Sequence, residues 1–441
     1  MKNWIKILAL TAFSTNAYAQ KSFTMDEALS YALENNVNIK KAKIDQTIAQ
    51  QKVYETIGIG LPQINLQGKY NYFLNIPVQL LPGEIFGQPG TYVPVKFGQK
   101  QTASGGVTVS QLLFNGSYIV GLESSKAYKE TAALVTEKTQ FSIKEAIMLS
   151  YAAVLITDEN IKTLEENKRV SGKVLNDTKE TYKAGLIELQ NVEQLDYSYR
   201  NLVTTLDNLK RTRTKFADAL KYLMGYPLEE NLQLITSMEE LIQKSELLVD
   251  KTEPADISNH IDFKLKENLV RISELKLKYQ KSKALPTLAA ALSSSYNGNS
   301  DKMTFFDKEQ KWFNTSVVAL QLDIPVFSGL QRHWQTEQSK LDLAKAKLDK
   351  EDTEKSLRNE LTSKSLDYEN AYESFKTAQD LVKLSSEIYR KQNIKFKEGL
   401  GTSFELSQSE SQLFQAQSQF YLSALDLIKA KISLDKAKGT L

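Results

Sequence analysis

The sequence predicts an α+β protein that arose by tandem duplication, with two β-strands and two long helices in each half. Three patterns lead to this prediction. Short motifs recur in the same order, long segments carry apolar residues at every seventh position, and four segments of about ten residues alternate between apolar and polar side chains. A seven-residue repeat is typical of coiled helices, whereas a two-residue repeat is typical of strands.

The duplication is visible first in two glycine-containing motifs. Tyr182–Leu186 reads YKAGL and Phe396–Leu400 reads FKEGL, and their glycines, Gly185 and Gly399, lie 214 residues apart. Each motif interrupts a helical pattern only briefly, although a glycine inside a helix costs about 1 kcal/mol relative to alanine. A brief break flanked by strong helical pattern indicates a turn between two helices.

Other motifs recur in the same order along the chain. They are LLFNG at 112–116 with PVFSG at 325–329, Leu61-Pro62 with Leu285-Pro286, and Gly225 with Gly439. Self-similarity of this kind indicates two copies of one structural unit. We therefore predict a first repeat at 20–226, a polar and irregular connector at 227–260, and a second repeat at 261–441.

The long segments 117–183 and 330–397 are predicted to be helices of roughly 100 Å each, at 1.5 Å per residue. Both carry apolar residues at a spacing of seven, which favours left-handed supercoiling with neighbouring helices. A plain soluble coiled coil is the alternative interpretation, because heptads alone do not exclude it. The heptad positions are Val120, Ala127, Leu134, Phe141, Met148 and Leu155 in the first segment, and Leu361, Tyr368, Phe375, Val382, Tyr389 and Phe396 in the second.

Four segments alternate between apolar and polar side chains and are predicted to be strands with one apolar face. Each is about as long as a tilted strand that crosses a membrane. The alternative is a pair of hairpins in a small soluble sheet, with the apolar face packed on helices. The apolar positions are Ile64, Leu66, Tyr70 and Tyr72; Val107 and Val109; Leu288, Ala290, Leu292 and Tyr296; and Val318, Leu320, Leu322 and Ile324.

Four strands are too few to close a barrel in lipid, because known membrane barrels begin at about eight strands. If these strands cross a membrane, several chains must share one barrel, with eight strands in a dimer or 12 in a trimer. The segment 75–99 contains four prolines and four glycines and is predicted to be an exposed loop at the end of the first hairpin.

The chain has 441 residues, a net charge of +3 at pH 7 and no cysteine. This small charge argues against binding to nucleic acid. The absence of cysteine excludes disulfides and zinc–thiolate sites, and the two histidines, His260 and His333, have no companions suited to a metal site. No phosphate-binding or nucleophile motif occurs. We therefore expect no enzyme activity, cofactor or metal.

The N-terminus has the pattern of an export signal. Lys2 and Lys6 accompany a short apolar run, and residues 17–19 fit the small-x-small cleavage pattern. We expect residues 1–19 to be a signal peptide, with an amphipathic helix as the alternative. No later run of about 20 apolar residues occurs, so no transmembrane helix is predicted. Export without cysteine points to the bacterial periplasm or outer membrane.

The ordered set of features resembles the TolC family of outer-membrane efflux proteins. A signal peptide, a duplication, two strands per half between long helices, and the aromatic-x-x-Gly-Leu turns carry this resemblance, which extends from residue 24 to residue 441. It implies an α+β membrane protein and a homotrimer, in which four strands per chain form a shared 12-stranded barrel in the outer membrane. The barrel would continue as a long coiled α-helical barrel in the periplasm.

The resemblance also implies a function and partners. The protein would be a passive exit duct for efflux or secretion, embedded in outer-membrane lipid and gated at its periplasmic tip. A periplasmic adaptor (membrane fusion protein) would dock at the tip and couple it to an inner-membrane pump that supplies the energy. The alternative is a soluble periplasmic coiled-coil or adaptor-type protein without membrane strands.

The resemblance assigns adaptor docking to the two turns, at Gly185 and Leu186 and at Gly399 and Leu400. It assigns the gate to residues around the second turn. Phe396 matches an aromatic residue that helps to hold the inner coils closed.

Glu405 stands where a carboxylate forms the constriction, and three such carboxylates around a threefold axis would favour cations. The alternative is that Glu405 is a solvated first-turn residue, favoured near a helix N-terminus. The chain departs from the family pattern at three positions. Gln408 replaces a second acid, Gly401 replaces an arginine of the closing network, and Asn191 replaces the aspartate that would pair with that arginine.

Overall fold

The computed structural model describes residues 22–246 and 257–441, which form two compact units. Unit 1 comprises residues 22–43, 136–261 and 354–441, and unit 2 comprises residues 44–135 and 262–353. Each unit therefore combines segments from both halves of the chain. The predicted signal peptide, residues 1–19, lies outside the described residues.

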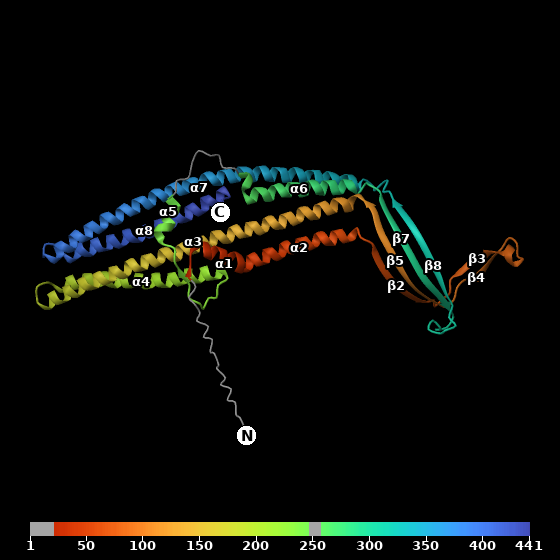
Figure 1. The fold of residues 1–441 in the computed structure, drawn as a ribbon, viewed down its shortest axis with the longest axis horizontal. Helices are drawn as coiled ribbons and strands as arrows, with labels where there is room; N and C mark the ends of the chain where they lie inside the picture. The colour runs from red at the N-terminus through yellow and green to blue at the C-terminus, as the bar shows by residue number, and fades with distance from the viewer. Residues whose placement is uncertain (1–21, 247–256) are drawn as a thin grey trace, which may run out of the picture. The chain divides into compact units, whose positions relative to one another are not determined.

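Four long helices dominate the secondary structure. They are α3 (Gly116–Lys183), α4 (Leu189–Met224), α7 (Gln331–Lys397) and α8 (Ser403–Lys438). The bounds of α3 and α7 agree with the predicted helices 117–183 and 330–397 to within one residue. In unit 1, α4 runs back along α3 and α8 runs back along α7 (Figure 1).

The order of the elements is the same in the two halves. The first half contains α2 (Val37–Ile59), β2 (Gln63–Tyr72), β5 (Gln101–Asn115), α3 and α4. The second half contains α6 (Ile261–Ser282), β7 (Thr287–Ser300), β8 (Trp312–Asp323), α7 and α8. This shared order is what the predicted duplication requires, and α4 and α8 have the same length of 36 residues. The repeat boundaries themselves stay a prediction.

The four predicted strands form one antiparallel sheet in unit 2, in the order β2-β5-β7-β8. Its register aligns the apolar positions across all four strands: Ile64 is opposite Val109, Val109 is opposite Leu292, and Leu292 is opposite Val318. Because opposed residues in an antiparallel pair point to the same side, the apolar positions share one face of the sheet. The other face carries mainly amide and hydroxyl side chains.

The apolar face of this sheet is bare within the protein. Leu66 is 80% exposed and Val318 is 77% exposed, so the helices do not cover it as the soluble-sheet alternative requires. Among the described residues, β2 and β8 each pair with a single neighbour and therefore leave one edge of backbone groups open. An open edge beside an exposed apolar face is a strong liability for a soluble protein.

The predicted loop at 75–99 is wrong in part, because it contains a separate two-stranded ribbon. The strands β3 (Val78–Pro82) and β4 (Tyr92–Lys96) pair around a short 3-10 helix, η1 (Gly83–Phe86). Two of the prolines that suggested a loop lie in the ribbon, where a two-stranded pair tolerates them: Pro94 is opposite Leu80 and Pro82 is opposite Tyr92. The apolar residues between the prolines supply the strand pattern.

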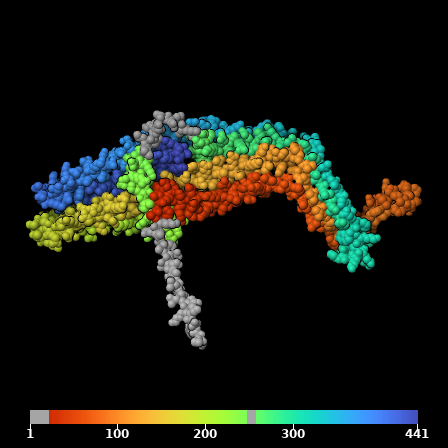
Figure 2. Space-filling view, in the orientation of Figure 1, coloured from red at the N-terminus to blue at the C-terminus, as the bar shows by residue number. Residues whose placement is uncertain are grey.

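The predicted irregular connector is also partly ordered. It contains β6 (Gln233–Leu234), α5 (Met238–Glu246) and, after residues 247–256, the short η2 (Ile257–Asn259). The apolar spacing of Met238, Leu241 and Ile242 buries one face of α5 against the core of unit 1. Figures 1 and 2 show the light-green α5 segment lying across the long helices.

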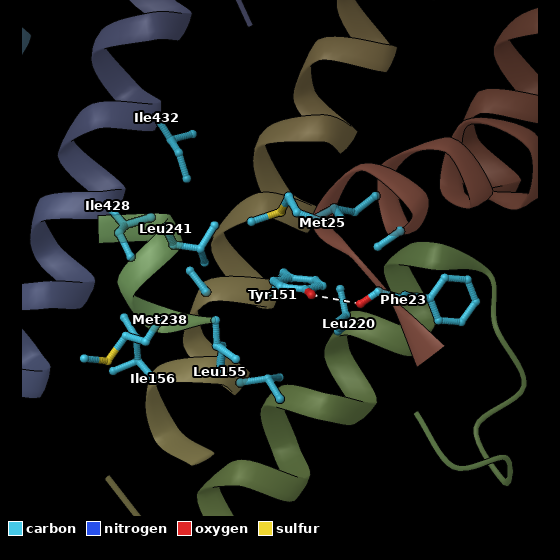
Figure 3. Close-up of a cluster of buried hydrophobic side chains, with 14 of the residues drawn as sticks. Phe23, Met25, Tyr151, Leu155, Ile156, Leu220, Met238, Leu241, Ile428 and Ile432 are labelled. Carbon is cyan, nitrogen blue, oxygen red and sulfur yellow. Dashed lines mark hydrogen bonds between the residues drawn. The ribbon is translucent and has the colours of Figure 1, made fainter. Parts of the chain in front are cut away.

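The core of unit 1 is organised around a fully buried tyrosine on α3 (Figure 3). The hydroxyl of Tyr151 donates to the carbonyl of Phe23 at 2.9 Å and lies 3.0 Å from Oγ1 of Thr236. Phe23 belongs to β1 (Ser22–Phe23), which leads into α1 (Met25–Asn35) and pairs with β6 in parallel. Tyr151 therefore joins α3 to β1 and to Thr236, two residues beyond β6, while Leu241 of α5 packs in the same cluster as Ile428 of α8.

We predict that Tyr151→Phe destabilises unit 1 by about 1–3 kcal/mol, because it removes the buried hydroxyl that donates to the Phe23 carbonyl and accepts from the Thr236 amide. The measurement is the denaturant midpoint of the detergent-solubilised protein followed by circular dichroism. Tyr222→Phe is the matched control, since Tyr222 lies exposed on α4. Equal midpoints for the two variants would contradict the role given to Tyr151.

Candidate functional site

The two predicted turns have the same geometry and lie at one end of unit 1 (Figure 1). Gly185 and Gly399 adopt left-handed backbone conformations, with φ of +74° and +72°. The amide of Leu186 donates to the carbonyl of Thr181 at 3.2 Å, and the amide of Leu400 donates to that of Lys395 at 2.9 Å. These bonds span five residues and close each helix in a Schellman motif, which requires glycine at the left-handed position.

Both turns present a leucine to solvent. Leu186 is 75% exposed and Leu400 is 81% exposed. The residue after the glycine of a Schellman motif commonly packs back on its own helix. Here the two leucines instead supply apolar surface at equivalent positions, and their role in docking a partner stays a prediction.

The helix after the second turn begins with a capping box. The amide of Glu405 donates to Oγ1 of Thr402 at 3.1 Å, and the amide of Thr402 donates to Oε2 of Glu405 at 3.0 Å. These bonds, mainly that from the Thr402 backbone, lower the pKa of the Glu405 carboxyl from its usual 4.5. Glu405 is thus exposed and ionised at neutral pH, and one of its oxygens stabilises the start of α8. This arrangement supports the first-turn interpretation.

An uncharged hydrogen bond joins the two turns. Oγ of Ser403 donates to Oδ1 of Asn191 at 2.7 Å, and Ser403 is buried. The bond links the start of α8 to the start of α4. Near this point the family pattern has an arginine–aspartate pair, and Gly401 and Asn191 stand at those two positions in this chain. Gly401 contributes space, because a Cβ there would lie 3.2 Å from Cβ of Lys395 and 3.3 Å from the Phe396 amide nitrogen. A larger residue at position 401 would have to push these atoms apart, so glycine lets the turn pass close to the end of α7.

Phe396 is partly buried and packs against an apolar cluster between the helices near the turns. The buried members of the cluster are Val174, Leu175, Val192, Leu195 and Leu406. Phe396 thus holds α7 to the neighbouring helices of the same chain by apolar contact. This position agrees with the predicted role in closure, which stays a prediction.

Gln408 lines a groove of about 570 Å³ between α4 and α8 that the sequence analysis missed. The lining combines apolar residues such as Leu164, Leu202 and Phe414 with uncharged polar side chains, and the polar ones follow alternating spacings of three and four along each helix. That spacing is a readable signal in the sequence, but the sequence analysis considered only the apolar residues at heptad spacing. The stripes are Gln194, Ser198, Asn201, Thr205, Asn208 and Thr212 on α4, and Gln408, Ser411, Gln415 and Ser418 on α8.

Among the described residues, no helix combines the length and the apolar character that a membrane span requires.

Comparisons with known proteins agree with this architecture. Residues 269–440 match the family described as outer membrane efflux protein. The chain is 20% identical over 445 residues to outer membrane protein TolC of Vibrio cholerae serotype O1, an alignment that covers 100% of this chain and 96% of that protein.

Two solved structures share the fold at low sequence identity. CusC matches with a TM-score of 0.76 and 14% identity, covering 94% of this chain and 91% of its own. The CmeC outer membrane channel of Campylobacter jejuni matches with a TM-score of 0.73 and 14% identity, covering 94% and 85%. The predicted resemblance to TolC-like outer-membrane efflux proteins and the outer-membrane localisation are confirmed by these comparisons taken together.

We predict that the start of α8 loses protection from amide exchange as the pH falls below about 4.5. The pKa of Glu405 is lower in the folded protein than in the unfolded chain, so its stabilisation is present above the unfolded value and is lost as the pH falls through the folded value. Hydrogen exchange of residues 403–408, corrected for its intrinsic pH dependence, measures this loss.

Glu405→Gln is the control for this effect, because glutamine keeps the acceptor of the capping box without a titrating group. Its protection should be independent of pH over the same range. A pH dependence shared by both proteins would show that Glu405 does not cap α8.

Proposed function

We propose that this chain, which resembles the TolC-like outer-membrane efflux proteins in sequence and fold, is the exit channel of an efflux or secretion assembly. Three copies would share one 12-stranded barrel in the outer membrane, and their helices would form a duct in the periplasm. The observation that carries the proposal is the four-stranded sheet with open edges and a bare apolar face. A protein that transports but does not react with its cargo also fits the absence of catalytic motifs from the sequence.

The sheet has the properties that a share of a membrane barrel requires. Its strands contain 10 to 15 residues, enough for tilted strands to cross the hydrocarbon region. Backbone groups in lipid must all be paired, so β8 of one copy would pair with β2 of the next until the ring closes. Two copies would give eight strands and three would give 12, and the family resemblance favours three.

The opposite face of the sheet would line the lumen of the barrel. Across the register, Asn65, Thr108 and Ser293 form one polar row, and Gln67 with Ser295 and Thr315 contributes to another. Amides and hydroxyls bind water without a fixed charge. The same face also carries Lys69 on β2 and Asp323 on β8, so the proposed lumen would be a wet wall with one charge of each sign per chain.

The turns would be the end of the duct that meets the partners. A periplasmic adaptor would bind Leu186 and Leu400 together with the adjoining Gly185 and Gly399, and it would connect the duct to an inner-membrane pump. Energy would come from the pump, because the chain itself carries no nucleotide-binding motif.

The gate would lie beside the turns in this proposal. Three copies of Glu405 would form an acidic constriction in which the Thr402 hydrogen bonds favour the ionised carboxylate and the neighbouring like charges oppose it. Gln408 and Phe396 would complete the narrow end. The Asn191–Ser403 hydrogen bond would hold the two turns of each chain together in place of an ion pair.

The competing function is a soluble periplasmic coiled-coil protein. It shares the long helices but needs a cover for the apolar face of the sheet. The exposure of Leu66 and Val318 favours the membrane channel instead.

We predict that Leu66→Arg prevents assembly in the outer membrane, whereas Asn65→Arg on the opposite face of the same strand is tolerated. An arginine that faces lipid costs about 2–4 kcal/mol near the bilayer centre, while one that faces water costs little. Membrane fractionation and the yield of the assembled oligomer on mild-detergent gels measure the difference. Equal yields of both variants, or wild-type protein released by osmotic shock, would contradict the membrane sheet.

We predict that Leu400→Ser reduces export at least tenfold while leaving the oligomer assembled, because it removes apolar contact area from the proposed docking surface without touching the fold. Cellular accumulation of an exported dye is the readout. Leu422→Ser, at an exposed position on α8 away from the turns, is the control and should leave export unchanged. Normal export by the Leu400 variant would remove this residue from the docking surface.

A further inference from the structure

A carboxylate is buried among the helices near the two turns. Glu410 lies on α8 and is only 4% exposed. It is distinct from the exposed Glu405 of the proposed gate, although both belong to the same helix. Buried acids are rare unless they are paired, because an ionised carboxylate loses much of its solvation in the interior.

The groups around Glu410 do not supply a positive charge. The hydroxyl of Ser171 on α3, itself buried, hydrogen-bonds the carboxylate. Tyr389 of α7 is its titratable neighbour, and Gln194 and Ser198 of α4 are uncharged and line the same groove. Over residues 22–246 and 257–441, no lysine, arginine or histidine nitrogen lies within 4.0 Å of the Glu410 carboxylate.

The surroundings therefore favour the neutral acid. Burial raises the pKa of the Glu410 carboxyl above its usual 4.5, and the Ser171 hydrogen bond only partly opposes this change. The pKa of the Tyr389 hydroxyl is raised as well, by burial first and by the charge of Glu410 second. Two acids that both resist ionisation thus lie where α8 meets α3 and α7.

We propose that Glu410 is a proton-controlled switch of helix packing beside the turns. The protonated side chain permits α8 to pack on α3 and α7, and the ionised side chain weakens that packing. The polar groove gives the ionised form a route to water, because Glu410 forms part of its wall. The inference does not require the proposed channel function, since it concerns contacts within one chain.

The direction of the pH dependence follows from the raised pKa. Below the unfolded value of about 4.5 the acid is neutral in both packed and loosened states, so the packing is unaffected. As the pH rises, the loosened state ionises first and is favoured increasingly. The weakening of the packing reaches its full extent once the pH exceeds the raised pKa of Glu410 in the packed state.

Hydrogen exchange of the full-length detergent-solubilised oligomer tests the switch. Between pH 4.5 and 8, after correction for intrinsic exchange, protection of residues 406–415 in α8 should fall about tenfold for each unit by which the packed pKa exceeds 4.5. Glu410→Gln should show protection that does not vary with pH. A wild-type profile as flat as that of the variant would overturn the proposal.

Two further variants exclude a general effect of pH. Ser171→Ala removes the donor that favours the ionised form, so the loss of protection should extend to higher pH and become larger. Glu405→Gln should keep the wild-type dependence across this range. An unchanged profile for Ser171→Ala, or a flat one for Glu405→Gln, would overturn the assignment to Glu410. If the pH profile holds while export and outer-membrane assembly fail their own tests, only the channel proposal falls.

Discussion

The need to pair the backbone groups at the open edges of one sheet is the constraint from which the proposed assembly follows. The strands β2 and β8 each offer a row of backbone donors and acceptors, and the apolar side chains beside them, such as Leu66 and Val318, are exposed. Water could hydrogen-bond the backbone groups at the open edges, but exposure of the apolar face to water is unfavourable. Lipid would solvate the apolar face, but it cannot hydrogen-bond the backbone groups at the edges. Only pairing between copies in a membrane satisfies both. The proposed outer-membrane channel would meet both requirements of this sheet.

In the helical part, contacts of several kinds hold the long helices in register. Tyr151 connects α3 by hydrogen bonds to β1 and to Thr236, which follows β6, and α5 lies against the same core. Near the turns the contacts change in kind: Phe396 packs in a small apolar cluster, Ser403 bonds Asn191, and Glu405 caps α8. The Ser403–Asn191 bond between the turns is uncharged, whereas the cap of α8 uses the Glu405 carboxylate. With a buried Glu410 nearby, closure would respond to proton concentration more than to salt.

Much of the fold could be predicted because it depends on periodic patterns. The bounds of α3 and α7, the four strands and their apolar face all follow from repeats of seven and two. The candidate site was harder to predict from the sequence. Gly185 and Gly399 were found because the same motif occurs twice, whereas the Thr402–Glu405 box was overlooked although its spacing is local and readable. The ribbon β3–β4 was hidden by its prolines, and α5 by its shortness. The groove and the burial of Glu410 depend on how α8 meets other helices, and no local pattern reveals that.

The most direct test of the shared barrel is a disulfide scan between the two open edges. The chain contains no cysteine, so single cysteines can be placed in pairs along β2 and β8 and oxidised in intact cells. Pairing of β8 with β2 of the next copy predicts cross-linked species that end at three chains, formed at positions that keep one antiparallel register. Cross-links confined to two chains, or none at any pair of positions, would contradict the account.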